Sequence, residues 1–166
     1  MIKLLVLDVD GCLTDGKIIY TSSPTEVKEF NVKDGLAIAS WIRMGHHVAI
    51  ITGRNSFIVQ RRADELGIQH LYQGIKDKDK ILRQIVESLH LEFSEVAAIG
   101  DDLNDYGMLS IVGRSFTPNN GVSEIQKLVN TILSKNGGDG AVREMIDIII
   151  EENKQKEEFL SLWIKD

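Results

Sequence analysis

Two aspartates stand directly behind the first apolar run of the chain, in the segment LLVLDVDGCLTDG at residues 4–16. Asp8 and Asp10 are separated by one residue, so both belong to the end of the same expected strand and point the same way. Carboxylates crowded together repel one another, and such a cluster favours a bound cation. Beside a phosphate ester, one carboxylate can attack the phosphorus, and the second can act as general acid and base.

Other strand ends carry groups that fit the same chemistry. After the second strand come the hydroxyl of Thr52, the backbone amide of Gly53 and the guanidinium of Arg54. After the fourth strand come three further acids and an amide side chain, Asp101, Asp102, Asp105 and Asn104. Lys76, Lys78 and Lys80 alternate at the start of a later helix, and a lysine can hold a phosphate as a point charge. An all-oxygen ligand set predicts a hard ion, and Mg²⁺ is favoured over Ca²⁺ because it prefers few carboxylates and a substrate phosphate.

An alternation of strands and helices explains why these groups would meet. Five segments are expected to be strands, at residues 2–9, 47–52, 70–73, 95–100 and 114–117. The segments between and after them are expected to be helices, at residues 34–44, 56–66, 79–90, 103–111, 121–128 and 140–152. This order predicts one α/β domain with a Rossmann-like, doubly wound parallel sheet, in which ligands bind at the carboxyl ends of the strands.

Length and composition limit the class of protein. The 166 residues suffice for one domain with a full core, and 43% hydrophobic and 27% charged residues are typical of globular proteins. The net charge of -6 argues against nucleic acid or an anionic membrane as the main partner. The single cysteine, Cys12, excludes a disulfide within the chain, and no apolar run approaches the roughly 20 residues of a membrane span. We therefore expect a cytoplasmic protein.

The motifs DVDGCLTDG, ITGR and GDDLND, with a lysine between the last two, resemble those of the haloacid dehalogenase-like phosphatases. Further segments are similar to the 3-deoxy-D-manno-octulosonate 8-phosphate phosphatases of lipopolysaccharide synthesis, namely FNVKDGLAI (30–38), ITGRNSFIVQRRADELGI (51–68), LYQG (71–74) and GGDGAVRE (137–144). The resemblance covers about residues 1–150. It implies a magnesium-dependent phosphatase that releases 3-deoxy-D-manno-octulosonate and phosphate through an aspartyl-phosphate.

The same resemblance implies a role for each motif residue. Asp8 would be the nucleophile and a metal ligand, and Asp10 the acid/base, with its backbone carbonyl on Mg²⁺. Asp101 would be the third metal ligand, supported by Asp102 and Asp105. Thr52 and Gly53 would bind the phosphate, together with Lys78. Among the three lysines, the family's spacing back from Gly100 favours Lys78.

The gaps between motifs lack room for the cap domain that many relatives insert. Residues 1–151 are expected to form the phosphatase domain, with only a small β-hairpin at about 17–31 in place of a cap, and residues 152–166 a C-terminal tail without a recognisable motif. In the resembled family, four subunits associate through these hairpins, and each covers its neighbour's site. The apolar Ile18, Ile19, Tyr20 and Val27 fit burial at such a homotetramer interface.

Arg54 is the candidate for selecting the substrate. Its guanidinium would stand at the rim of the site and grip the carboxylate of the sugar acid in a bidentate manner. In the resembled family, members that prefer nine-carbon sugar-acid 9-phosphates tend to have an acid there and a lysine at the position of Gly67. Arg54 together with Gly67 therefore predicts the octulosonate 8-phosphate. The competing interpretation is that Arg54 only pairs with a nearby acid.

Three other readings stay open at this point. The substrate can be a nine-carbon sugar-acid 9-phosphate, or the chain can be a phospho-acceptor signalling module or a non-catalytic oligomerising domain. Signalling modules place their acceptor aspartate after a middle strand, whereas here the paired acids come first and GDD later. A non-catalytic domain would not need Asp8 and Asp10. The four histidines and Cys12 lack partners for metal binding or nucleophilic catalysis, so we expect packing roles for them.

Overall fold

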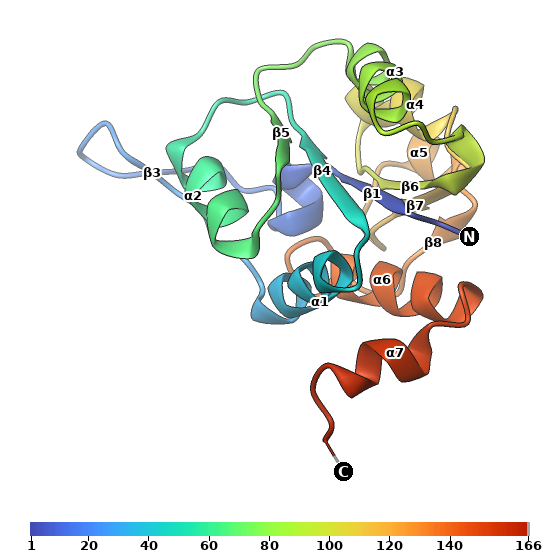
Figure 1. Ribbon diagram of the computed structural model, residues 1–166. Helices are drawn as coiled ribbons and strands as arrows, with labels where there is room; N and C mark the ends of the chain where they lie inside the picture. Colours follow the sequence, from blue (N-terminus) through green and yellow to red (C-terminus); the bar gives the residue numbers. More distant parts are fainter. Residues whose placement is uncertain (166) are drawn as a thin grey trace.

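The computed structural model describes residues 1–165, and its main feature is a six-stranded parallel sheet. The strand order is β5-β4-β1-β6-β7-β8, so the first strand lies in the middle of the sheet (Figure 1). The strands are β1 (Leu4–Leu7), β4 (His47–Ile51), β5 (His70–Tyr72), β6 (Val96–Ile99), β7 (Arg114–Thr117) and β8 (Thr131–Ile132). The expected doubly wound α/β fold is confirmed, because the order reverses on either side of β1.

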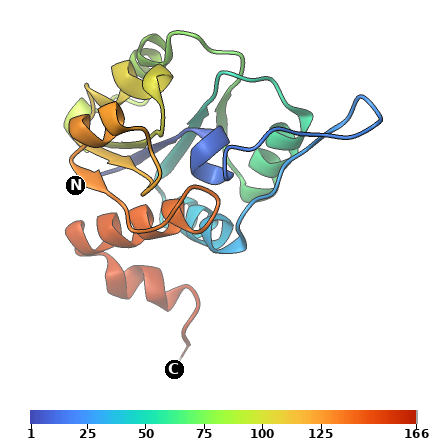
Figure 2. The same ribbon diagram turned by 180° about the vertical axis from the view of Figure 1, so that it is seen from behind.

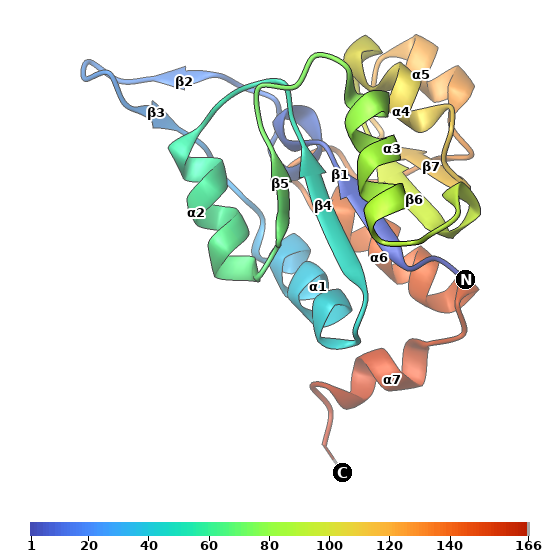
Figure 3. The ribbon, with the colours of Figure 1, turned by 45° about the horizontal axis from the view of Figure 1, so that its top comes forward.

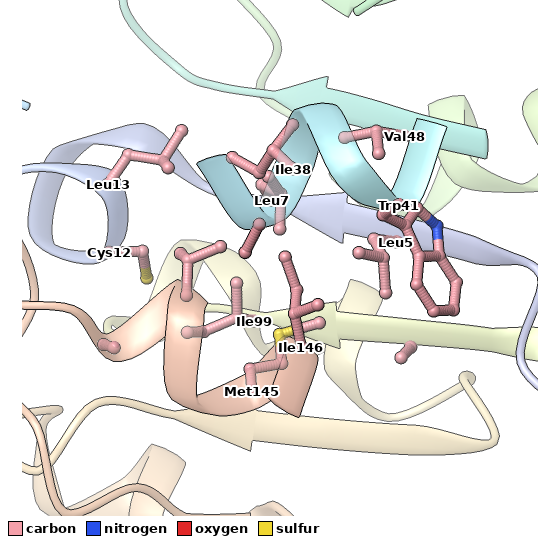
Figure 4. Close-up of a cluster of buried hydrophobic side chains, with 14 of the residues drawn as sticks. Leu5, Leu7, Cys12, Leu13, Ile38, Trp41, Val48, Ile99, Met145 and Ile146 are labelled. Atoms are coloured by element: carbon pink, nitrogen blue, oxygen red, sulfur yellow. The ribbon is translucent and has the colours of Figure 1, made fainter. Parts of the chain in front are cut away.

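Helices cover both faces of this sheet. They are α1 (Val32–Arg43), α2 (Phe57–Leu66), α3 (Lys78–Ser88), α4 (Tyr106–Leu109), α5 (Ser123–Leu128), α6 (Ala141–Glu152) and α7 (Lys156–Ser161). Side chains of β1 alternate between the two faces, as a strand requires. Leu5 and Leu7 face the core formed with α1 and α6, whereas Leu4 and Val6 face α3 and α4. Figure 4 shows the first of these cores, with Trp41 and Met145 packed over β1.

Two differences from the expected elements lie between residues 103 and 132. The helix expected at 103–111 is divided into a 3₁₀ turn (Leu103–Asp105) and the short α4, because the Asp105 side chain turns back to accept backbone N–H bonds. Strand β8 was not expected, because two residues are too few to give a strand pattern in the sequence. Among residues 1–165, no helix has the length and apolar character needed to cross a membrane.

The last fifteen residues include helix α7, which packs back on the domain. Phe159 is buried in the core under α6, and the indole N–H of Trp163 donates to the Ser40 hydroxyl of α1 at 2.9 Å. The Asn153 side chain pairs with both backbone groups of Ile2, at 2.9 Å each, and so ties the junction of α6 and α7 to the start of β1. Figure 2 shows α7 at the end of the molecule remote from the hairpin.

The expected hairpin is present as two short antiparallel strands, β2 (Ile19–Tyr20) and β3 (Glu26–Val27). Figure 3 shows it extending away from the sheet, beyond the start of α2. Tyr20 is 77% exposed, and Ile18 and Val27 are also exposed. The hairpin therefore presents apolar side chains to solvent and does not fold them onto its own domain.

A buried aspartate joins α1 to α6. Asp34, in the first turn of α1, accepts the backbone N–H of Arg143 at 2.8 Å through Oδ1. Its other oxygen, Oδ2, has no hydrogen-bond partner among residues 1–165. Burial raises the pKa of Asp34 to about 6, against the opposing effect of the Arg143 N–H bond. The folded protein therefore binds a proton at this position more tightly than the unfolded chain does.

This carboxyl group predicts a pH dependence of stability. It binds protons more tightly in the folded chain than in the unfolded chain, where its pKa is near 3.8, so its stabilising contribution is complete below that value and is lost as pH rises to about 6. Asp34→Asn keeps an acceptor for Arg143 but does not titrate. When the pH rises from about 3.8 to about 6, the free energy of unfolding of the wild type should therefore fall by about 3 kcal/mol relative to that of Asp34→Asn, as measured by urea titration. An unchanged pH slope in Asp34→Asn, equal to that of the exposed control Asp64→Asn, would contradict this.

Candidate active site

Three neighbouring strands deliver their polar ends to one pocket. β1 pairs with β4 on one side and with β6 on the other, all in parallel, so the residues that follow them lie side by side. The pocket has a volume of about 240 Å³ and is lined by Asp8, Asp10, Gly16, Thr52, Gly53, Arg54, Asp101, Asp102 and Asn104. All the motif residues expected at the site line it except Lys78 and Asp105, which lie directly behind Asp8.

The turn after β1 brings its backbone close to Asp101. Gly11 has a φ of +100°, which side-chain-bearing residues rarely adopt, and a Cβ there would lie 2.0 Å from Asp101 Oδ2. Thr14 Oγ1 accepts the N–H groups of Gly11 and Gly16, at 3.3 and 3.2 Å, and so fixes the turn from within. The glycine is therefore required both for the backbone path and for the space beside the acid.

The glycine-rich segment 137–140 supports this turn from behind. A Cβ at Gly137 would lie 1.8 Å from the carbonyl oxygen of Gly11, and the N–H of Gly138 donates to the Cys12 carbonyl at 3.0 Å. Asp139 does not line the active-site pocket. Gly137 and Gly138 are therefore needed because a side chain at either position would collide with the backbone of the turn after β1.

Lys78 is buried between two carboxylates. Its Nζ lies 2.6 Å from Asp8 Oδ1 and 2.6 Å from Asp105 Oδ1, and its side chain is 1% exposed. Burial opposes the charged ammonium, but the two carboxylates outweigh that effect and raise the pKa of Lys78. Lys76 and Lys80 are exposed. Of the three alternating lysines, only Lys78 reaches the site.

Asp105 holds the loop that follows β6. Its Oδ2 accepts the backbone N–H groups of Asp101 and Asp102, at 2.9 and 3.3 Å, while Oδ1 faces Lys78. A Cβ on Gly100 would lie 2.4 Å from the Asp105 Cβ, so only glycine permits this approach. Asp105 therefore orients Asp101 without lining the pocket itself.

The acids at the pocket fit a divalent cation. Asp8 and Asp101 each bring an oxygen within 4.8 Å of the other and of the Cys12 sulfur. Burial, together with the charge of Asp105, raises the pKa of Asp8 despite Lys78, and burial and Asp105 raise that of Asp101 to about 6. A cation beside both oxygens would offset the burial and the repulsion that cause these shifts. Burial raises the pKa of the Cys12 thiol, which suits packing better than ligation of a hard ion.

Thr52 and Arg54, which follow β4, also line the pocket. Thr52 is 2% exposed, and its backbone is fixed by bonds to Tyr72 O and from Ile75 N, at 3.0 and 3.1 Å. Arg54 is exposed, and its guanidinium donates to Glu26 Oε2 at 3.3 Å. Arg54 thus pairs with a nearby acid in the single chain, as the competing interpretation expected, and it also lines the pocket.

Two residues of the hairpin were missed by the sequence analysis. Lys28 Nζ lies 2.6 Å from Asp10 Oδ1 and 2.8 Å from Glu26 Oε1. These residues belong to no motif. The sequence hinted at them only through the alternation of charged and apolar residues, which suggests that Glu26 and Lys28 face the opposite side of the hairpin from Val27. No histidine of the described residues 1–165 lines the pocket. His46 stacks on Trp41, and His47 packs edge-on against His70.

Comparisons with known proteins agree with this arrangement. The family model of haloacid dehalogenase-like hydrolases matches residues 71–146, the part of the chain that contains Lys78, Asp101 and Asp105. The sheet order, the paired acids after β1 and the buried lysine behind them define a hydrolase of this class. A 3-deoxy-D-manno-octulosonate 8-phosphate phosphatase of Yersinia pestis is 40% identical over 149 residues, which cover 90% of this chain and 80% of that protein.

Solved structures are also similar over almost the whole chain. The enzyme of the same name from Moraxella catarrhalis, in complex with magnesium ion, phosphate ion and KDO, has a TM-score of 0.94 and 42% identity, over 98% of this chain and 94% of that one. The cobalt-bound form of the Haemophilus influenzae phosphatase has a TM-score of 0.88 and 34% identity, over 93% and 91%. The chain belongs to the 3-deoxy-D-manno-octulosonate 8-phosphate phosphatase family.

Proposed function

We propose that this chain is a magnesium-dependent phosphoric monoester hydrolase that converts 3-deoxy-D-manno-octulosonate 8-phosphate to 3-deoxy-D-manno-octulosonate and phosphate. The observation that carries this proposal is Asp8, a buried carboxylate that opens on the pocket and is backed by Lys78 at 2.6 Å. The names of the similar proteins and the bound groups of the Moraxella catarrhalis structure support the substrate and the metal. The reaction would serve lipopolysaccharide precursor synthesis in the cytoplasm.

In the first half-reaction, an Asp8 oxygen attacks the phosphorus of the 8-phosphate. The bond between phosphorus and the sugar oxygen breaks, and Asp10 gives a proton to that leaving oxygen. Asp8 then carries the phosphoryl group as an aspartyl-phosphate, and the free sugar acid leaves. The 2.6 Å contact of Lys78 with Asp8 aims the attacking carboxylate and keeps a positive charge beside the transferring group.

In the second half-reaction, water attacks the phosphorus of the aspartyl-phosphate. Asp10, now ionised, takes a proton from that water, the bond between Asp8 and phosphorus breaks, and inorganic phosphate is released. Thr52 donates its hydroxyl, and Gly53 its backbone N–H, to the phosphoryl oxygens. Asp102 and Asp105 hold the loop that carries Asp101.

Asp8, Asp101 and the backbone carbonyl of Asp10 would hold Mg²⁺. The bound ion supplies positive charge that draws the phosphate toward Asp8 and offsets the charge that develops on its oxygens. Two carboxylates with one carbonyl leave room for water and a phosphate oxygen, which matches the coordination preference of this ion.

Arg54 is proposed to bind the substrate's carboxylate. It lies at the rim of the pocket, and a guanidinium matches a carboxylate in a bidentate manner. In the free chain Arg54 pairs with Glu26 at 3.3 Å, so the carboxylate of the substrate would replace that of Glu26 on the guanidinium. The exposed, salt-screened pair with Glu26 contributes little energy and is readily replaced.

Replacing Arg54 should change the choice of substrate. Arg54→Ala should lose about 1.5–3 kcal/mol in kcat/KM on the octulosonate 8-phosphate, the range for a charged hydrogen bond, and much less on glucose 6-phosphate, which lacks the carboxylate. Steady-state phosphate release measures both, and Arg61→Ala, exposed on α2, is the matched control. Equal losses on both sugars would withdraw the assignment. A wild type that prefers a nine-carbon sugar-acid 9-phosphate would replace the proposed substrate.

The active form is proposed to be a homotetramer in which the hairpin of one subunit covers the site of another. The pocket of the single chain is open beside Arg54, and the hairpin exposes Ile18, Tyr20 and Val27. Exposed apolar side chains on a projecting element are typical of an interface. A neighbour's hairpin would exclude water and add surface for the sugar.

A charge on the hairpin tests this assembly. Ile18→Glu would bury an unpaired carboxylate at the contact, so we expect smaller species in sizing by light scattering. Activity on the octulosonate phosphate should fall strongly, and activity on p-nitrophenyl phosphate should fall less. Leu160→Glu, a similarly exposed position on α7 at the other end of the molecule, is the control. A fully active monomer of the wild type or of Ile18→Glu would refute the proposal.

A further inference from the structure

One lysine of the hairpin points inward although its neighbours are exposed. The Lys28 side chain is 1% exposed, whereas Tyr20 on the partner strand is 77% exposed. Its Nζ lies 2.6 Å from Asp10 Oδ1 and 2.8 Å from Glu26 Oε1. A lysine is taken out of water only where opposite charges replace the solvent, and here two carboxylates do so.

These contacts continue to the substrate side of the pocket. Glu26 Oε1 faces Lys28, and Glu26 Oε2 accepts from Arg54 at 3.3 Å. Asp10, Lys28, Glu26 and Arg54 therefore form a chain of alternating charges with no net charge. Its two ends are the acid/base at the reaction centre and the guanidinium at the rim, and both line the pocket.

The geometry at Asp10 indicates what Lys28 does there. One carboxylate oxygen, Oδ1, is held by the ammonium, and no group among residues 1–165 donates a hydrogen bond to the other, Oδ2. A carboxylate on a half-exposed loop otherwise rotates among several orientations. With Oδ1 fixed, the unbonded Oδ2 is the atom left to exchange a proton with the leaving oxygen and later with water.

We propose that Lys28 is a positioning residue that orients the Asp10 carboxylate for proton transfer, and that Glu26 holds Lys28 in place, also when the substrate has taken Arg54 from it. The hairpin thereby takes part in the chemistry of its own subunit, in addition to its proposed contact with a neighbour. This inference rests on the proposed function, because it requires Asp10 to exchange a proton with the leaving oxygen.

A role confined to anchoring the hairpin explains these contacts less well. Phe30, two residues further along, already packs against the core, with Arg62 stacked over its ring at 5.6 Å. An apolar side chain at position 28 would anchor the hairpin without the cost of removing an ammonium from water. The buried charge has a clear use only if its partner must be held in one orientation.

The test compares two leaving groups, using kcat/KM because it reports the steps up to departure of the leaving group. Lys28→Met keeps the unbranched stem and removes the charge. On the octulosonate 8-phosphate and on glucose 6-phosphate, whose alkoxide leaving groups both need a proton, we expect a loss of about 10- to 100-fold, part of the full contribution of general acid catalysis. On p-nitrophenyl phosphate, whose leaving anion is stable without a proton, the loss should stay within about threefold.

Matched variants separate positioning from folding and from phosphate binding. Lys28→Arg should recover most of the lost rate, and Glu26→Gln should show the same substrate pattern with a smaller loss. Lys17→Met, an exposed lysine on the same hairpin, should behave as the wild type. Inhibition by orthovanadate, a probe of the phosphoryl site, should be unchanged in Lys28→Met if the site is still folded.

Several results would overturn the inference. Equal losses on the alkyl and aryl esters, weaker inhibition by orthovanadate, or a Lys28→Met protein as active as the wild type would each do so. Failure of the proposed function is a separate result. A wild type that ignores the octulosonate phosphate but hydrolyses other alkyl phosphates refutes that substrate, and the comparison of alkyl with aryl esters then still tests Lys28.

Discussion

The buried contact of Lys78 with Asp8 and Asp105 is the interaction on which the rest of the site depends. Three carboxylates, those of Asp8, Asp101 and Asp105, converge on one edge of the sheet, and each is removed from water to a large extent. Without a counter-charge, their repulsion and burial would cost several kcal/mol per ion. Lys78 supplies one positive charge from behind, and the acids on the pocket side are suited to receive a second from Mg²⁺.

The fold makes this convergence possible because β1 lies between β4 and β6. Parallel strands end at the same edge of a sheet, so acids after β1 and β6 and a hydroxyl after β4 become neighbours without any long loop. Two glycines then permit contacts that a Cβ would block, Gly11 against Asp101 and Gly100 against Asp105. The stability of the buried sheet is therefore what holds the charged groups at short distances.

Strands β1, β4 and β6 were predictable because buried strands are continuous apolar runs, and most helices were predictable because amphipathic helices repeat with the helical period. Features set by contacts distant in sequence were not. Strand β8 has only two residues, and the contact of Lys28 with Asp10 joins residues eighteen positions apart, with the hairpin strands β2 and β3 between them. The choice of Lys78 did carry a signal, because it shares a helix face with the buried Leu82 and Ile85.

The proposed reaction requires that Asp8 receives the phosphoryl group during turnover. The most direct measurement is to quench the wild type during turnover with Mg²⁺, reduce any acyl-phosphate with borohydride, and map the modified residue by peptide mass spectrometry. We expect conversion of Asp8 to homoserine, dependent on both substrate and Mg²⁺ and abolished by EDTA. Sustained turnover with Asp8 unmodified and the label on another residue, or undiminished turnover by Asp8→Asn, would contradict it.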